Sequence, residues 1–142
     1  MGVVVDVVSA LILELNAEAW SQPFTASMNY RPRYNATELR ALTVTVVPRR
    51  LTIEPETRDY DVREIQIDLA VQQLLSQESN EEIGGLLNLV DEIARHFRLR
   101  RLAAMPQALC TKIENEPIYA VEHLDELRCF TSIITLSFRI VG

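Results

Sequence analysis

Two histidines are the side chains of this 142-residue chain best suited to acid–base chemistry. His123 stands beside Glu122 and Asp125, and a histidine–carboxylate pair is the arrangement a general base requires. The same spacing is also typical of a histidine that only caps a loop, and we favour that interpretation. His96 lies in the basic run 95–101, where we expect a solvated or dipole-stabilised residue. A small cytosolic enzyme built on His123 stays open as an alternative.

The other reactive or ligand-binding residue types do not occur at useful spacings. Cys110 and Cys129 are too few and too far apart for a disulfide framework or a zinc site, so we predict two buried free thiols. A cross-strand disulfide is the alternative if their strands are neighbours in register. Gly84 and Gly85 do not form a phosphate-binding loop. We therefore predict a protein that is not an enzyme and has no catalytic residue, cofactor or metal.

The charge balance argues against a protein that grips nucleic acid. The chain has 20 acidic and 14 basic residues, a formal net charge of −6, and acidic surfaces repel phosphate. The basic run 95–101 is better explained as a cationic helix end or an ion-pairing interface. The apolar start of the chain is interrupted by Asp6 and Glu14, so we expect neither a targeting signal nor a membrane segment.

The first third of the chain predicts one helix and two strands. Apolar residues recur at helical spacing over 4–19. The segment 24–34 alternates loosely, and Pro32 confines this strand to an edge or a bulge. A single helical turn over 35–40 leads into 41–48, which is β-branched and alternating.

A long, charged connection between two strands is predicted over 49–59. Connections of this length in a compact domain are usually functional or disordered, so we interpret the segment as an arm that contacts a neighbouring subunit or a partner. Its mixed charges would set the register of that contact more than its affinity. The residues assigned to this interface are Arg49, Arg50, Leu51, Ile53, Glu54, Glu56, Arg58 and Asp59.

The second half predicts another strand and the longest helix. The strand covers 60–74, and a bulge near Arg63 and Glu64 would restore its alternation. Ser79 or Asn80 can cap a helix whose apolar positions recur over 83–97.

Two further strands are predicted over 109–121 and 127–141, joined by a polar turn at 122–126. Residues 1–142 thus form one α+β domain with a mostly antiparallel sheet packed by two helices. The expected order of elements is α-β-β-β-α-β-β.

In the order of its elements and in their residue pattern, the chain resembles the tail terminator, or tail completion, proteins of long-tailed bacteriophages. The resemblance covers most of the chain. It is carried by the amphipathic opening helix, the strands 42–48 and 61–69, the helix 83–97 and the closing strand 130–139.

The resemblance implies a structural virion protein of the neck, a subunit of a hexameric ring assembled in the host cytoplasm. Such a ring binds the last ring of the tail tube protein, ends tube growth and offers a docking surface to the head–tail connector protein. DNA passes through its lumen without specific binding. The alternatives are another neck component, such as a head-completion or adaptor protein, and a ligand-binding module with a closed apolar pocket.

Overall fold

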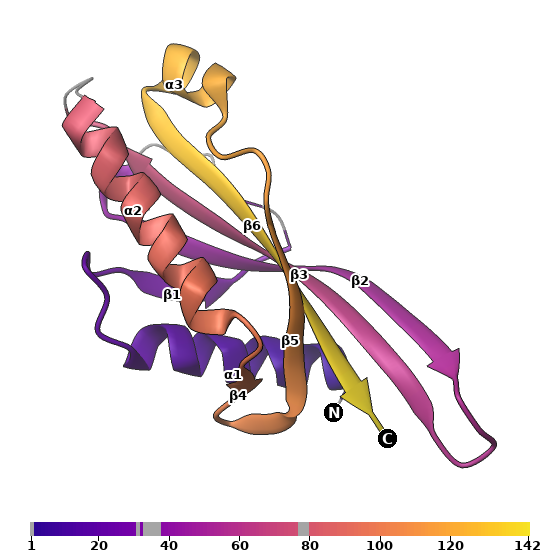
Figure 1. The fold of residues 1–142 in the computed structure, drawn as a ribbon. Helices are drawn as coiled ribbons and strands as arrows, with labels where there is room; N and C mark the ends of the chain where they lie inside the picture. Colours follow the sequence, from indigo (N-terminus) through magenta and orange to yellow (C-terminus); the bar gives the residue numbers. More distant parts are fainter. Residues whose placement is uncertain (1, 31, 33–37, 77–79) are drawn as a thin grey trace.

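The computed structural model describes residues 2–30, 32, 38–76 and 80–142, and it confirms a mixed α+β fold (Figure 1). In these residues the elements are, in chain order, α1 (Val3–Ala17), β1 (Thr25–Met28), the 3-10 turn η1 (Glu38–Arg40), β2 (Thr43–Pro55), β3 (Asp61–Leu74), α2 (Asn80–Phe97), β4 (Arg101–Leu102), β5 (Met105–Asn115), α3 (Val121–Leu127) and β6 (Cys129–Val141).

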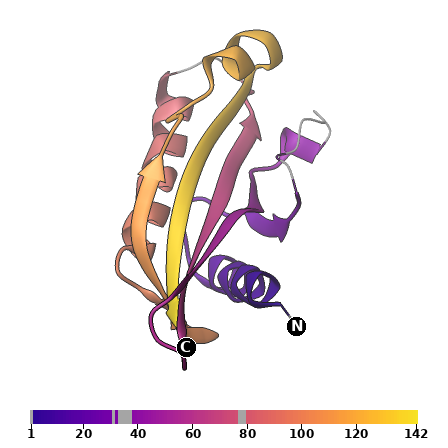
Figure 2. The ribbon, with the colours of Figure 1, turned by 90° about the vertical axis from the view of Figure 1, so that its right-hand side faces the viewer.

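The six strands form one curled sheet in the order β1-β2-β3-β6-β5-β4 (Figure 2). Every neighbouring pair is antiparallel except β1 and β2, which run parallel with Thr25 opposite Thr43. The prediction of a mostly antiparallel sheet is therefore confirmed. β1 lies at an edge, as predicted, but it ends at Met28, so Pro32 lies beyond the strand that was expected over 24–34.

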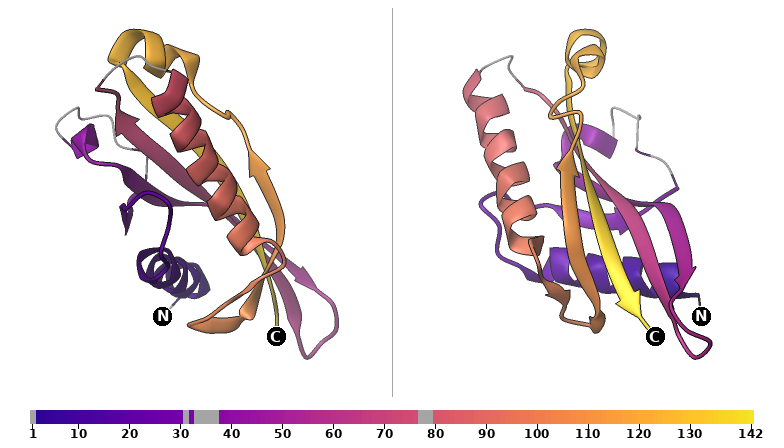
Figure 3. Two further views of the ribbon diagram at one scale, coloured as in Figure 1. Left: turned by 60° about the vertical axis from the view of Figure 1, so that its left-hand side comes forward. Right: turned by 45° about the vertical axis from the view of Figure 1, so that its right-hand side comes forward.

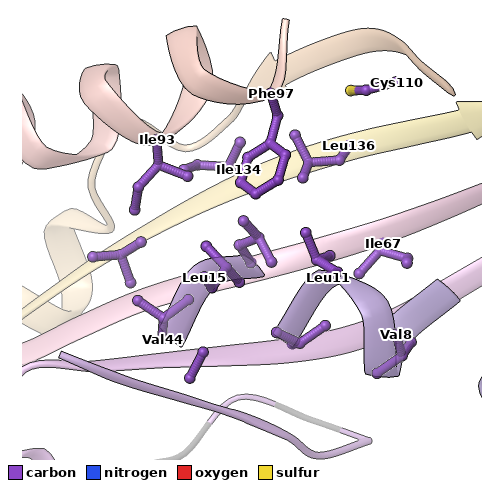
Figure 4. Packing of buried hydrophobic residues seen from close by; sticks show 14 of the residues in the cluster. Val8, Leu11, Leu15, Val44, Ile67, Ile93, Phe97, Cys110, Ile134 and Leu136 are labelled. Carbon is purple, nitrogen blue, oxygen red and sulfur yellow. The ribbon is translucent and has the colours of Figure 1, made fainter. Parts of the chain in front are cut away.

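The two long helices bury their apolar stripes against one face of the sheet. Val8, Leu11 and Leu15 of α1 recur at helical spacing and are buried. They belong to one apolar cluster with Ile93 and Phe97 of α2, parts of which Figure 4 shows from close by. Among the described residues, no helix is both long enough and apolar enough to cross a bilayer.

A buried carboxylate joins these helices. Glu14 of α1 accepts hydrogen bonds from His96 Nε2 at 2.8 Å, Arg100 Nε at 2.6 Å and the Ala103 backbone N–H at 2.9 Å. Its side chain is 6% exposed. His96 also packs edge-on against Trp20 and is itself largely buried. The expectation of a solvated His96 is thus wrong, because this histidine is part of an ion-paired contact inside the domain.

The end of α1 is fixed to the edge strand by one amide side chain. Asn16 Oδ1 accepts from the Ala26 N–H at 2.8 Å, and Asn16 Nδ2 donates to the Ala26 carbonyl at 3.1 Å. We expect Asn16→Ala to lower the free energy of unfolding by about 1–3 kcal/mol, because both backbone groups of a buried residue lose their partner. Urea denaturation measures this loss. Glu18→Ala, at an exposed position just beyond the helix, is the control; equal effects of the two substitutions would contradict the prediction.

Several predicted boundaries need correction. The bulge lies in β2, where the register shifts between Pro48 and Arg50 and makes Arg49 the extra residue, and not near Arg63 and Glu64 of β3. Val62 breaks the alternation because it lies on the face of the sheet opposite the core, beside Val141.

The last third of the chain also differs from the prediction. The strand expected at 109–121 is shifted toward the N-terminus, with β4 paired to its start. The polar turn expected at 122–126 is the helix α3. The helix predicted at 83–97 begins at Asn80, and Ser79 lies outside the described residues. Of the helical turn expected at 35–40, the described half, 38–40, is the 3-10 turn η1.

The two cysteines are buried and free, as predicted. Cys110 pairs with Phe138 in the last part of β6, whereas Cys129 is the first residue of that strand. The two thiols therefore lie at opposite ends of β6, which rules out the cross-strand disulfide. Burial raises the pKa of Cys110 to about 11 and raises that of Cys129, so both stay protonated at neutral pH.

Candidate subunit interface

The segment predicted as a connecting arm is the far half of a long hairpin. β2 continues through it to Pro55, and β3 begins at Asp61, so the connection itself covers only 56–60. This tight turn is held by the Tyr60 carbonyl, which accepts from the N–H groups of Glu56 and Thr57. The prediction of a long loop is wrong because the strand alternation continues past Pro48. The arm is therefore a strand hairpin that extends beyond the rest of the molecule (Figure 1).

The arm has an apolar face that is uncovered. Leu51 pairs with Ile65 and Ile53 with Arg63, so both side chains lie on the face of the sheet that carries the core. Ile65 is fully buried, whereas Leu51 is 41% and Ile53 52% exposed. The helices thus cover the core face as far as Ile65 and leave the arm beyond it open. Large apolar side chains gathered on a projection are typical of a contact surface.

The turn of the arm is acidic. Between positions 54 and 61 the acidic residues are Glu54, Glu56, Asp59 and Asp61, and Arg58 is the single base. All but Asp61 are exposed. The predicted interface residues at the tip therefore lie together, and Tyr60, which is 41% exposed, joins them.

Arg49 and Arg50 lie where the arm leaves the body of the sheet. Because Arg49 is the bulged residue, its side chain turns to the face opposite the core, where its guanidinium lies 3.7 Å from Asp68 Oδ1. Asp68 also accepts a hydrogen bond from Thr135 Oγ1 at 2.7 Å. The structure therefore separates Arg49 from the apolar face formed by Leu51 and Ile53.

The outer edge of β2 is open along the arm. β1 pairs with Thr43–Val46, and the Asn29 N–H donates to the Val46 carbonyl. Beyond Val46, no strand among the described residues pairs with the outer edge of β2. Pro48 has no backbone N–H to donate there, and the bulge at Arg49 twists the strand. Both features disfavour pairing with another strand at this position. Arg50–Glu54 keep their outward N–H and C=O groups for a partner.

The opposite end of the sheet is also incompletely covered. β4 pairs with β5 only at Met105 and Leu109, and the Cys110 N–H reaches the Arg100 carbonyl. Beyond this point, β5 has no second strand neighbour among the described residues. One copy of the chain thus presents an open strand at each end of its sheet, with β3 and β6 between them.

The histidine of the enzyme alternative holds α3 against the sheet. His123 Nδ1 lies 2.7 Å from Thr131 Oγ1 of β6, and Gln72 Nε2 donates to the same hydroxyl at 3.3 Å. This bonding gives His123 a structural task beside the cavity of about 290 Å³ that it lines with Asp68. Among the described residues, no group of three histidine, cysteine or acidic side chains is arranged to hold a metal ion.

No protein-family model matches this chain, and no curated protein matches its sequence significantly.

The segment 49–59, predicted as an arm, lies within the hairpin, but the hairpin extends beyond it. Tyr60 ends the turn of the arm, and Asp61 and Val62 begin its returning strand. The signal that could have found them is the alternation of Leu51 and Ile53 with polar neighbours, which continues the strand pattern across Pro48.

Proposed function

We propose that this protein is a structural subunit of a bacteriophage neck, a tail terminator whose copies form a ring. The ring, a hexamer in this proposal, caps the tail tube, ends its elongation and joins the tail to the head connector. The observation that carries the proposal is the arm, which exposes Leu51 and Ile53 on the core face of the sheet beside an open strand edge. A surface of this kind is stabilised when another subunit covers it.

The arrangement of the two open edges favours a ring. β2 and β5 lie at different ends of one sheet and differ in sequence, so a contact between them joins unlike surfaces of two copies. Such head-to-tail contacts close into rings when the rotation per subunit permits. The two faces of a ring are then different, and one binds the tube while the other binds the connector.

The acidic balance of the chain suits a ring around DNA. With a net charge of −6, a lumen lined by acidic side chains repels phosphate and lets the genome pass. On the sheet face opposite the core, Glu114 and Glu116 line a groove of about 590 Å³ together with Gln66 and one base, Arg49. We assign no specific DNA contact.

Electron microscopy of the purified protein, alone and with a tail tube protein, tests the proposal. We expect rings alone and tubes of uniform length when both are present. Rings that bind a portal and ignore tubes would instead make the protein a head-completion or adaptor subunit. A protein that stays monomeric and ignores tubes would refute the proposal.

Replacing both Arg49 and Arg50 with glutamate should impair capping about tenfold while the monomer stays folded. Both side chains are exposed at the base of the arm, and reversed charges there place like charges against the partner. The measurement is the fraction of capped tubes in electron micrographs. Arg40→Glu, an exposed reversal in η1, is the matched control. Normal tails from the double variant would remove these arginines from the contact.

A further inference from the structure

A groove of about 550 Å³ lies between the end of α2 and the outer edge of β5, two elements that run side by side (Figure 3). Its apolar lining includes Ala94, Leu99 and Ile113. Leu99 is 65% exposed, so its side chain is accessible to a partner. The rim is basic, with Arg95, Arg98 and Lys112.

The cations of this groove are available to a partner. Arg98 makes no ion pair with any residue in the described ranges. Arg95 pairs with Asp91, and Lys112 pairs with Glu114, but all four side chains are more than half exposed. Exposed pairs of this kind contribute at most about 1 kcal/mol, so a partner carboxylate can replace them at little cost. The groove therefore combines an apolar floor with a positive rim in a chain that is acidic as a whole.

We propose that this groove receives the arm of the neighbouring copy in the ring, an inference that rests on the proposed function. The arm has the complementary composition. Leu51 and Ile53 supply exposed apolar side chains, and the turn from Glu54 to Asp61 has three more acidic than basic residues. The apolar side chains lie against the floor near Leu99, and the acidic turn meets the basic rim.

The fold places the arm and the groove so that only a second copy can join them. The strand order puts β3 and β6 between β2 and β5, and neighbouring strands are about 4.8 Å apart, so a chain's own arm lies at the other side of the sheet. The arm also extends away from α2 (Figure 1). An arm from the next copy lies in the groove beside β5 where this strand lacks a neighbour in the described residues. The contact is therefore head-to-tail.

Charge exchange between the two surfaces tests the inference. Arg98→Glu reverses a charge on the rim of the groove. Glu54→Arg together with Glu56→Arg reverses two charges on the arm. Each change should raise the dissociation constant of the assembly at least about tenfold, because like charges then face each other. A chain that contains all three substitutions should assemble again. Sedimentation velocity at low salt measures the species formed.

Mixing the two single-surface variants gives a sharper result. The acidic arm of the Arg98→Glu chain fits the native groove of the Glu54→Arg, Glu56→Arg chain. The basic arm of the latter fits the groove with Arg98→Glu, as in the chain with all three substitutions. We therefore expect rings of alternating chains from the mixture and none from either variant alone. Arg40→Glu and Glu122→Arg, exposed reversals on η1 and α3, should leave the rings intact.

Two failures can be told apart. If the native protein forms rings and Arg98→Glu forms them equally well, the groove assignment is wrong while the proposed function stands. If the native protein forms no assembly alone or with tubes, the proposed function itself fails. Circular dichroism of each variant shows whether the monomer remains folded.

Discussion

Replacing Glu14 with alanine is expected to lower the free energy of unfolding by about 3 kcal/mol, the upper end of the cost of leaving buried hydrogen-bond groups without a partner, since Arg100 is 45% exposed and can be hydrated. The carboxylate accepts from the Ala103 N–H, His96 and Arg100. Without it, His96 stays largely buried against Trp20 with no acceptor. Proteins of this size are stabilised by only about 5–15 kcal/mol in total, so this is a large part of the stability.

Urea denaturation of the Glu14→Ala protein measures this loss. Glu14→Gln is the informative companion, since its amide oxygen can still accept from Ala103 while the charge facing Arg100 is gone; its loss should be smaller. Glu18→Ala, one turn further on and exposed, should change stability by less than about 0.5 kcal/mol. Equal stability of the Glu14→Ala and Glu18→Ala proteins would contradict the assignment.

The same carboxylate predicts the direction of the pH dependence. Burial alone raises the pKa of Glu14, but the hydrogen bonds from Ala103, His96 and Arg100 and the charge of Arg100 outweigh it, so the pKa is lowered from its ordinary value of 4.5. The contribution to stability is complete above that value and is lost as the pH falls through the lowered pKa. Unfolding curves should therefore show a smaller acid-induced loss for Glu14→Gln than for the native chain.

The parts of the fold that follow from local pattern could be predicted from the sequence. α1 and α2 place Leu11, Leu15 and Ile93 on their buried faces, as helical spacing requires. The final strand shows the same success, since Phe138 and Leu136 alternate toward the core.

Features that depend on pairing between distant segments could not be predicted. β1 pairs in parallel with β2, and Asn16 at the end of α1 holds β1 through Ala26. The residues next to Asn16 in the sequence do not indicate this contact. The burial of His96 depends on Glu14, 82 positions earlier. In the arm, the charges of 49–59 and the prolines at 48 and 55 indicated a loop, whereas cross-strand pairing with β3 keeps this segment extended.

Changing both Leu51 and Ile53 to aspartate should abolish assembly and leave the monomer folded. Each side chain is about half exposed in the monomer, so covering it contributes roughly half of the 1.5–3 kcal/mol for full burial, and losing both weakens association by roughly 10–10²-fold. The added carboxylates would also be desolvated in any remaining contact. Both residues are already partly exposed in the monomer, where an aspartate costs little.

The matched control for this change is Leu13→Asp on α1, where the leucine is 63% exposed and lies outside the arm. Mass photometry of the three proteins at equal concentration measures the oligomer distribution, and thermal unfolding monitors the fold. We expect rings from the native and Leu13→Asp chains and monomers from the arm variant. Since α1 and the arm lie in different parts of the molecule, a loss of rings in both variants would mean that exposed apolar residues act without regard to position, and the arm would then have no special role in assembly.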